Sequence, residues 1–181
     1  LVKIDASERK AFDALNLLTS KPELYVCNVD EASAASGNAY SKTVEERAKG
    51  EEAVAVVISA KIESELAQLD PEERNEYLGE LGLEEPGLNR LIRAGYNLLH
   101  LITFFTAGPK EARAWTVEKG SRAPQAAGGI HTDFERGFIR AQTIAFDDYI
   151  LLGRETPPKE AGNAPHDGKG YGSQAGDVLL V

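Results

Sequence analysis

Two short polar segments, each placed directly after an apolar run, contain the residues best suited to bind a ligand. Asn28 and Glu31 follow the run "LYVC", and the segment 59–61, "SAK", follows "AVAVVI". An amide such as Asn28 both donates and accepts hydrogen bonds, whereas an ionised carboxylate such as Glu31 only accepts them. These residue types suit recognition of a purine edge, and the Asn28 amide equally suits bracing of a neighbouring loop.

A simpler interpretation of the same residues is structural. Asn28 and Asp30 are common turn formers after a strand. Ser59 is a common cap for a following helix. The spacing of these residues leaves the ligand-binding and the structural interpretations open.

Two strands must position these segments. The run "ELYVCNV" (23–29) is rich in residues that favour strands. The run "AVAVVIS" (53–59) is apolar without alternation, which is typical of a strand covered on both faces of a parallel sheet. In such a sheet, ligands bind outside the carboxyl ends of the strands, where both polar segments lie.

Helical patterns accompany these strands. The clearest start is "DPEERNEYLGEL" (70–81), where Asp70 is a cap, Pro71 is the first helical residue and Glu73 completes a capping box. Three more helices are expected, at 5–18 with Asp5 or Ser7 as the cap, at 41–52, and at 86–100 with Leu88, Leu91, Ile92 and Gly95 on one face. The alternation of strands and helices predicts a parallel α/β layer through about residue 97.

The pattern changes after residue 97. One helical run, "FDDYILLG" (146–153), stands among short β-like runs separated by Gly, Pro and Asp. These β-like runs are 98–107, 112–121, 138–146 and 176–181. They predict a small mixed sheet with one helix, and a domain boundary near residue 97 or 98. The Pro- and Gly-rich end, 156–181, is expected to leave the closing edge of this sheet incomplete.

The chain resembles the C-terminal half of an Obg-like ATPase of the YchF type, a branch of the P-loop GTPases. The resemblance runs almost continuously over residues 10–155, through "LLTSKPELYVCNVDE", "VVISAKIESELAQLDPEER" and the long segment from "EPGLNRLIRAGYNLLH" to "DDYILLG". It implies an α/β fold, the C-terminal part of a parallel-sheet P-loop NTPase domain followed by a small α+β β-grasp (TGS) domain. The implied domains are the end of an inserted helical region (1–19), a partial nucleotide-binding domain (20–97) and a TGS domain lacking its last strand residues (98–181).

The resemblance also implies site residues. The GTPase class reads guanine with N-K-x-D, and this branch has N-x-x-E, here Asn28-Val29-Asp30-Glu31, which is associated with preference for ATP over GTP. Carried over, the base-binding residues are Asn28, Val29 and Glu31 in one loop, and Ser59, Ala60 and Lys61 in the other. The implied ligand of the intact family member is ATP, or GTP, with Mg²⁺.

The phosphate-binding side has no counterpart in this sequence. Hydrolysis in P-loop proteins needs G-x-x-x-x-G-K-[ST] after a strand. The one candidate, "AGNAPHDGKGYG" (161–172), has the wrong spacing, and Gly170 stands where Ser or Thr is needed. We therefore interpret it as a surface loop, assign no catalytic residue and expect this chain, as a fragment, to be inactive alone. The alternative is a non-catalytic module that binds RNA or the ribosome.

Residues from about 98 resemble the TGS domain, for which the family implies ribosome or RNA association. The resemblance is strongest in "GGIHTDFERGFIRAQ" (128–142), where His131, Arg136 and Arg140 are candidate contacts to RNA or a partner. His131 lacks a nearby nucleophile and also suits a structural hydrogen bond, and the two arginines also suit a solvated face. Trp115, Phe104 and Phe105 lie in strand patterns and are expected in the core.

Composition limits the remaining functions. The net charge is −9, with 11 Lys/Arg against 19 Asp/Glu in residues 1–97 and 9 against 10 in 98–181, so strong nonspecific nucleic-acid binding is not expected. Sequence-specific DNA binding is not expected either. No apolar run is long enough to span a bilayer, and no export signal is visible, so we expect a cytoplasmic protein without membrane contact. The three His and the single Cys27 lack metal-ligand spacing, and Cys27 suits a small buried hydrophobe.

Overall fold

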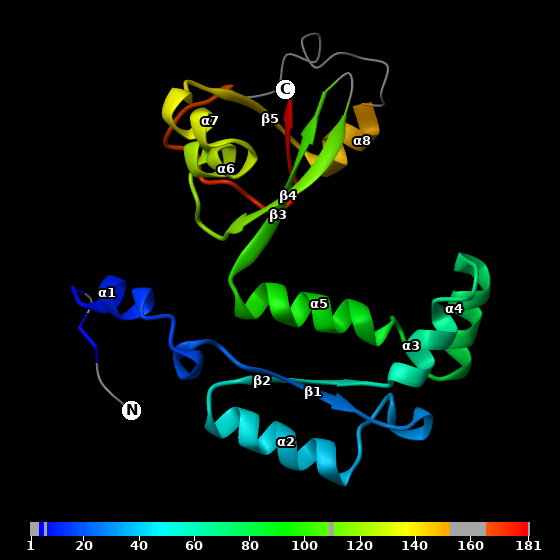
Figure 1. The fold of residues 1–181 in the computed structure, drawn as a ribbon. Coiled ribbons are helices and arrows are strands. Elements are labelled where there is room, and N and C mark those ends of the chain that lie inside the picture. Colours follow the sequence, from blue (N-terminus) through cyan, green and yellow to red (C-terminus); the bar gives the residue numbers. More distant parts are fainter. Residues whose placement is uncertain (1–3, 6, 109–110, 153–165, 181) are drawn as a thin grey trace. The chain divides into compact units, whose positions relative to one another are not determined.

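The computed structural model describes residues 4–5, 7–108, 111–152 and 166–180. The chain forms two compact units, Leu1–Leu98 and Leu99–Val181 (Figure 1). Within the described ranges, no helix combines the length and apolar character needed to cross a membrane.

The first unit is a small α/β layer. Its sheet has two parallel strands, β1 (Leu24–Asn28) and β2 (Val54–Ile58), paired in register from Leu24 opposite Val54 to Asn28 opposite Ile58. Its helices are α1 (Arg9–Ala14), α2 (Ala39–Gly50), α3 (Ala60–Leu66), α4 (Pro71–Glu80) and α5 (Gly87–Leu98), with short 3₁₀ turns η1 (Leu18–Ser20) and η2 (Glu31–Ser33). The predicted parallel α/β layer is confirmed.

Helices α2 and α5 cover opposite faces of the β1–β2 sheet (Figure 1). All five residues of β2 are nevertheless only half-buried, so the expectation of a strand fully covered on both faces is not met within this unit. The reason is that two strands with one helix on each face form a narrow layer. The best-buried apolar cluster lies instead around α3 and α4, and consists of Ala34, Ile62, Leu66 and Leu78.

Local signals explain where α4 and α5 begin. The Asp70 carboxylate accepts hydrogen bonds from the backbone N–H of Glu72 and Glu73 at 3.0 Å each, so the predicted capping box is confirmed. Helix α5 begins where the Glu63 carboxylate accepts from the N–H of Gly87 at 2.7 Å. A Cβ on Gly87 would lie 3.1 Å from a methyl group of Ile58, so glycine permits this close approach to the end of β2.

The first predicted helix is wrong in extent. Residues 5–18 form only the short α1, and neither Asp5 nor Ser7 is its cap, which is Glu8 without a side-chain hydrogen bond. Asn16 has a positive φ of 50°, a left-handed conformation that stops the helix. Leu15 and Leu18 beyond it are 63% and 82% exposed, so these two side chains gain little of the packing that would stabilise a longer helix.

The second unit contains a mixed five-stranded sheet in the order β4-β3-β7-β5-β6. Its strands are β3 (Leu101–Ala107), β4 (Ala112–Glu118), β5 (Ala141–Ala145), β6 (His166–Asp167) and β7 (Asp177–Leu180). Strand β7 runs parallel to β3 and antiparallel to β5. The predicted mixed sheet is confirmed, but β7 lies in the interior between two strands, so the expectation that the last strand forms an incomplete closing edge is wrong for the described residues.

Among the described residues, three helices accompany this sheet, whereas a single helix was predicted. Helix α8 (Phe146–Leu152) matches the expected one, and α6 (Ala123–Ile130) and α7 (Thr132–Gly137) were not expected. Phe104, at 1% exposed, is in the core as predicted. Phe105 and Trp115 are only half-buried. Phe105 packs against Phe146, which is itself 44% exposed, and Trp115 lies at a cavity described below.

Candidate functional site

The two polar segments lie side by side in the first unit. Asn28 and Ile58 are opposite one another at the carboxyl ends of the parallel strands β1 and β2. The Val29 N–H continues the pairing by donating to the Ile58 carbonyl at 2.9 Å. Because parallel strands end at the same edge of a sheet, both loops open at this one edge.

Asn28 links the two loops directly. Its Oδ1 accepts a hydrogen bond from the Ala60 N–H at 2.9 Å, across 32 residues of sequence. The Asn28 side chain therefore braces the second loop in this structure, which was one of the two roles open to it. The same bond engages the Ala60 N–H, so a ligand that uses this donor must compete with Asn28.

Glu31 and Lys61 form an ion pair between the same two loops. The Lys61 ammonium contacts Glu31 Oε1, and lies 4.0 Å from Glu65 Oε1 one helical turn further along α3. The hydrogen bond and charge of Glu31 raise the pKa of Lys61. Glu31 Oε1 is buried and has no well-directed hydrogen bond from the described residues, so the Lys61 ammonium is what balances its charge.

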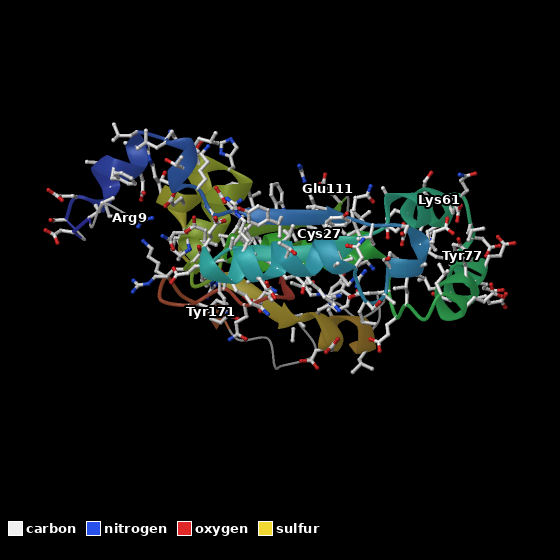
Figure 2. All side chains as sticks on the ribbon, turned by 90° about the horizontal axis from the view of Figure 1, so that it is seen from below. Arg9, Cys27, Lys61, Tyr77, Glu111 and Tyr171 are labelled. Atoms are coloured by element: carbon white, nitrogen blue, oxygen red, sulfur yellow. The ribbon has the colours of Figure 1, made fainter. Side chains whose placement is uncertain are left out.

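Tyr77 completes this polar cluster from α4. Its hydroxyl donates to Glu65 Oε2, and this bond together with burial raises the pKa of Tyr77 to about 12. Figure 2 shows Lys61 and Tyr77 at the same end of the first unit. The series of contacts Glu31–Lys61–Glu65–Tyr77 thus connects the two loops to the neighbouring helix α4, and the sequence alone did not indicate it.

Of the structural roles considered for Ser59 and Asp30, a helix cap and a turn former, only the second is found. Ser59 is the residue before α3 and is 3% exposed, yet its hydroxyl caps nothing and has no hydrogen-bond partner in the described part of the chain. Asp30 does act as a turn former, because its carboxylate accepts from the Ser33 N–H at 2.9 Å. Among the described residues, the buried hydroxyl of Ser59 is therefore an unpaired polar group where the second loop, residues 59–61, begins.

The other chemical candidates form no site. The segment 161–172 falls partly outside the described residues, and its described part contains the short strand β6 and a turn with exposed Lys169. Cys27 is half-buried on β1, and burial is the main cause that raises the pKa of its thiol. Among the described residues, no group of three or more His, Cys, Asp or Glu could hold a metal ion.

His131 has a structural hydrogen bond in the second unit. Its Nδ1 accepts from the Asp133 N–H at 3.2 Å, so His131 ends α6 and caps the start of α7. The imidazole is 61% exposed and lies 3.6 Å from the Asp133 carboxylate, so it also remains accessible to a partner. Arg136 and Arg140 are exposed on the same stretch.

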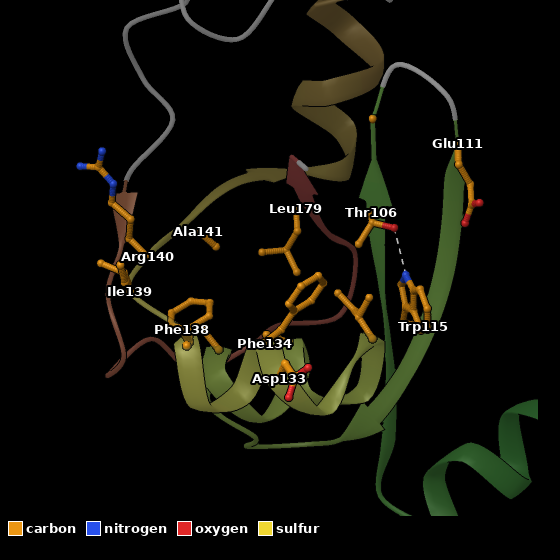
Figure 3. Close-up of a pocket in the computed structure, with 15 residues that line it drawn as sticks. Thr106, Glu111, Trp115, Asp133, Phe134, Phe138, Ile139, Arg140, Ala141 and Leu179 are labelled. Carbon is orange, nitrogen blue, oxygen red and sulfur yellow. Dashed lines mark hydrogen bonds between the residues drawn. The ribbon is translucent and has the colours of Figure 1, made fainter.

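A largely apolar cavity of about 730 Å³ lies between the sheet and α6–α7 of this unit (Figure 3). Its walls include Phe134, Phe138 and Leu179, and Arg140 lies at its rim with the guanidinium pointing outward. Trp115 is fixed on one side by a bond from its Nε1–H to Thr106 Oγ1 at 2.9 Å. This cavity was not predicted from the sequence, because it is lined by α6 and α7, the two helices that were not predicted.

The described fold matches a solved structure of the GTPase class. It superimposes on the "Structure of the Schizosaccharomyces pombe YchF GTPase" with a TM-score of 0.80 and 32% sequence identity, over 98% of this chain and 48% of that chain. Residues 101–181 also match the family model YchF-GTPase_C, described as a protein of unknown function (DUF933).

Curated proteins are similar to nearly the whole of this chain. The chain is 53% identical over 176 residues to "Ribosome-binding ATPase YchF" of Escherichia coli O157:H7, and 51% identical over 180 residues to the protein of that name in Bacillus subtilis. It spans 48% and 49% of the lengths of these two proteins. The chain is homologous to the C-terminal half of the YchF family, and the predicted resemblance is confirmed.

Proposed function

We propose that this chain is the base-recognising half and the adjoining TGS domain of a ribosome-associated purine-nucleotide hydrolase, with ATP preferred over GTP. The observation that carries the proposal is the bond between Asn28 Oδ1 and the Ala60 N–H, which joins two loops at one edge of a parallel sheet. Sheet edges of this kind bind nucleotides. The names of the relatives support both the nucleotide and the ribosome.

Each loop residue has a role in this proposal. Glu31 accepts hydrogen bonds from the base, and Val29 and the stem of Lys61 flank the ring. Asn28 holds the second loop, residues 59–61, against the first, so that the base meets a preformed edge. Ser59 contributes through its backbone, since its side chain is buried.

The phosphate chemistry lies outside this chain in the proposal. Bound Mg²⁺ neutralises charge on the β- and γ-phosphates in P-loop proteins. The residues described here do not fit a magnesium site, because they contain no cluster of acidic or other metal-ligating side chains suited to a metal ion. We therefore propose that the intact family member supplies the phosphate loop, and that this chain alone does not hydrolyse nucleotide.

The second unit is proposed to contact the ribosome or RNA in the cytoplasm. His131, Arg136 and Arg140 are the proposed contacts, because all three are exposed: His131 at the cap of α7, Arg136 in α7 and Arg140 in the segment after it. Arginine side chains suit phosphate oxygens. The acidic balance of the chain argues for a local, shape-directed contact, and against nonspecific binding to DNA.

Two titrations of the same ¹⁵N-labelled chain test the nucleotide part. AMP at millimolar concentration should shift the backbone amides of 28–31 and 59–61, because base recognition does not need the phosphate loop. Isothermal titration with ATP, with and without Mg²⁺, should show no Mg²⁺-dependent binding tighter than millimolar. Amide shifts confined to other segments, or tight Mg²⁺-dependent ATP binding by this chain, would contradict the proposal.

A further inference from the structure

One oxygen of the Glu31 carboxylate, Oε1, is already engaged in this structure. Glu31 Oε1 is buried and is in contact with the Lys61 ammonium. The Lys61 ammonium also lies near Glu65 Oε1, and Glu65 Oε2 accepts a hydrogen bond from the Tyr77 hydroxyl. Three side chains from α3 and α4 therefore hold one face of the Glu31 carboxylate.

The two purines make different demands on such a carboxylate. Guanine presents two neighbouring donors, N1–H and the 2-amino group, which together match both oxygens of a free carboxylate. Adenine presents one donor on this edge, the 6-amino group, beside the acceptor N1. A carboxylate with a single free oxygen satisfies adenine and leaves one guanine donor unpaired, and an unpaired donor in a contact costs binding.

We propose that Lys61 is a specificity-determining residue that removes the advantage of guanine by occupying one oxygen of Glu31. Glu65 and Tyr77 are positioning residues, because they act on the base only through Lys61. This inference rests on the proposed base site. It adds that the choice of purine depends on a residue in the second loop and not on Glu31 alone.

The exposure of the pair does not argue against this role. Exposed ion pairs contribute little to folding stability, and the side chains of Lys61 and Glu31 are 71% and 38% exposed. Selectivity, however, depends on which atoms of Glu31 are occupied when the base arrives. Because Glu31 Oε1 is in contact with the Lys61 ammonium, loss of the ammonium leaves this oxygen without a compensating charge.

The test compares AMP and GMP as probes on the full chain by NMR titration of the amides of 28–31 and 59–61. Lys61→Met removes the ammonium and keeps the stem, and should raise affinity for GMP relative to AMP by about tenfold, the effect of roughly one hydrogen bond to a charged group. Lys61→Arg keeps the charge and is the matched control, with an expected ratio close to that of the parent chain. Glu65→Gln and Tyr77→Phe should move the ratio in the same direction by less.

The outcomes separate this inference from the proposed function. If both nucleotides still shift the two loops but Lys61→Met leaves their ratio unchanged, or favours AMP, the role of Lys61 is wrong and the base site stands. If neither nucleotide shifts these amides in any variant, the base site and the inference both fail. Before nucleotide is added, retained hydrogen-exchange protection of the Ala60 amide, which is bonded to Asn28, reports that each variant keeps the link between the two loops.

Discussion

At the scale of single residues, Tyr77 offers a titration that reports the polar cluster. Its pKa of about 12 lies above the ordinary tyrosine value of 10.0, chiefly because its hydroxyl donates to the Glu65 carboxylate. When the pKa of a group is higher in the folded protein than in the unfolded chain, the group stabilises the fold. This stabilisation is complete below the pKa of the unfolded chain and is lost as the pH rises through the pKa of the folded protein. The Tyr77–Glu65 contact should therefore weaken between about pH 10 and 12.

The measurement is the difference in tyrosinate absorbance between the parent chain and Tyr77→Phe. We expect the difference curve to titrate well above the ordinary tyrosine range. Glu65→Gln in the Tyr77-containing chain is the matched control and should bring that curve down toward 10.0, because the charge that opposes ionisation is gone. A difference curve already centred at the ordinary value in the parent chain would contradict the Tyr77–Glu65 bond.

The residue types of the site could be chosen from the sequence, but their connections could not. Asn28, Glu31 and Lys61 follow two strand patterns, which placed them at one sheet edge. Their partners depend on side-chain geometry across about thirty residues of sequence, where no local pattern operates. The bond from Ala60 to Asn28 and the ion pair from Lys61 to Glu31 became visible only in the structure.

At the scale of elements, the capping box of α4 carries a measurable share of stability. Asp70 accepts from two backbone N–H groups that would otherwise lack a partner inside the helix. Asp70→Ala should destabilise the first unit by about 1 kcal/mol, and Asp70→Asn, which keeps an acceptor, by less. Hydrogen exchange at the amides of Glu72 and Glu73 checks this, and equal protection in the parent chain and Asp70→Ala would contradict it.

Elements with strong local signals were predictable, and those without them were not. Helix α4 has a cap, a proline and a box partner in consecutive positions, and β1 is a compact run of strand formers. Helix α6 was missed because "APQAAGGI" contains a proline and two glycines, which lower helix propensity. One usable signal was present, since Gln125 accepts from the Arg122 N–H at 2.7 Å in the manner of a box partner.

At the scale of the whole molecule, each unit has its own buried cluster. Ile62, Leu66 and Leu78 lie in the cluster of the first unit, and Ala123 and Phe138 lie in that of the second. Trp115 is the single tryptophan of the chain and belongs to the second unit, where Thr106 holds its indole. Its fluorescence therefore reports unfolding of the second unit alone.

We expect the two units to unfold as separate cooperative transitions, because a domain with its own core can fold as its own unit. Ile62→Ala, at a side chain that is 1% exposed, should destabilise the first unit by about 2–5 kcal/mol. In urea it should shift the helical circular dichroism transition and leave the Trp115 fluorescence midpoint unchanged. Phe104→Ala, equally buried in the second unit, is the matched control and should shift the fluorescence midpoint instead. A shift of the Trp115 midpoint by Ile62→Ala would show that the two units are energetically coupled. The description of the chain as two separately folded units would then be wrong.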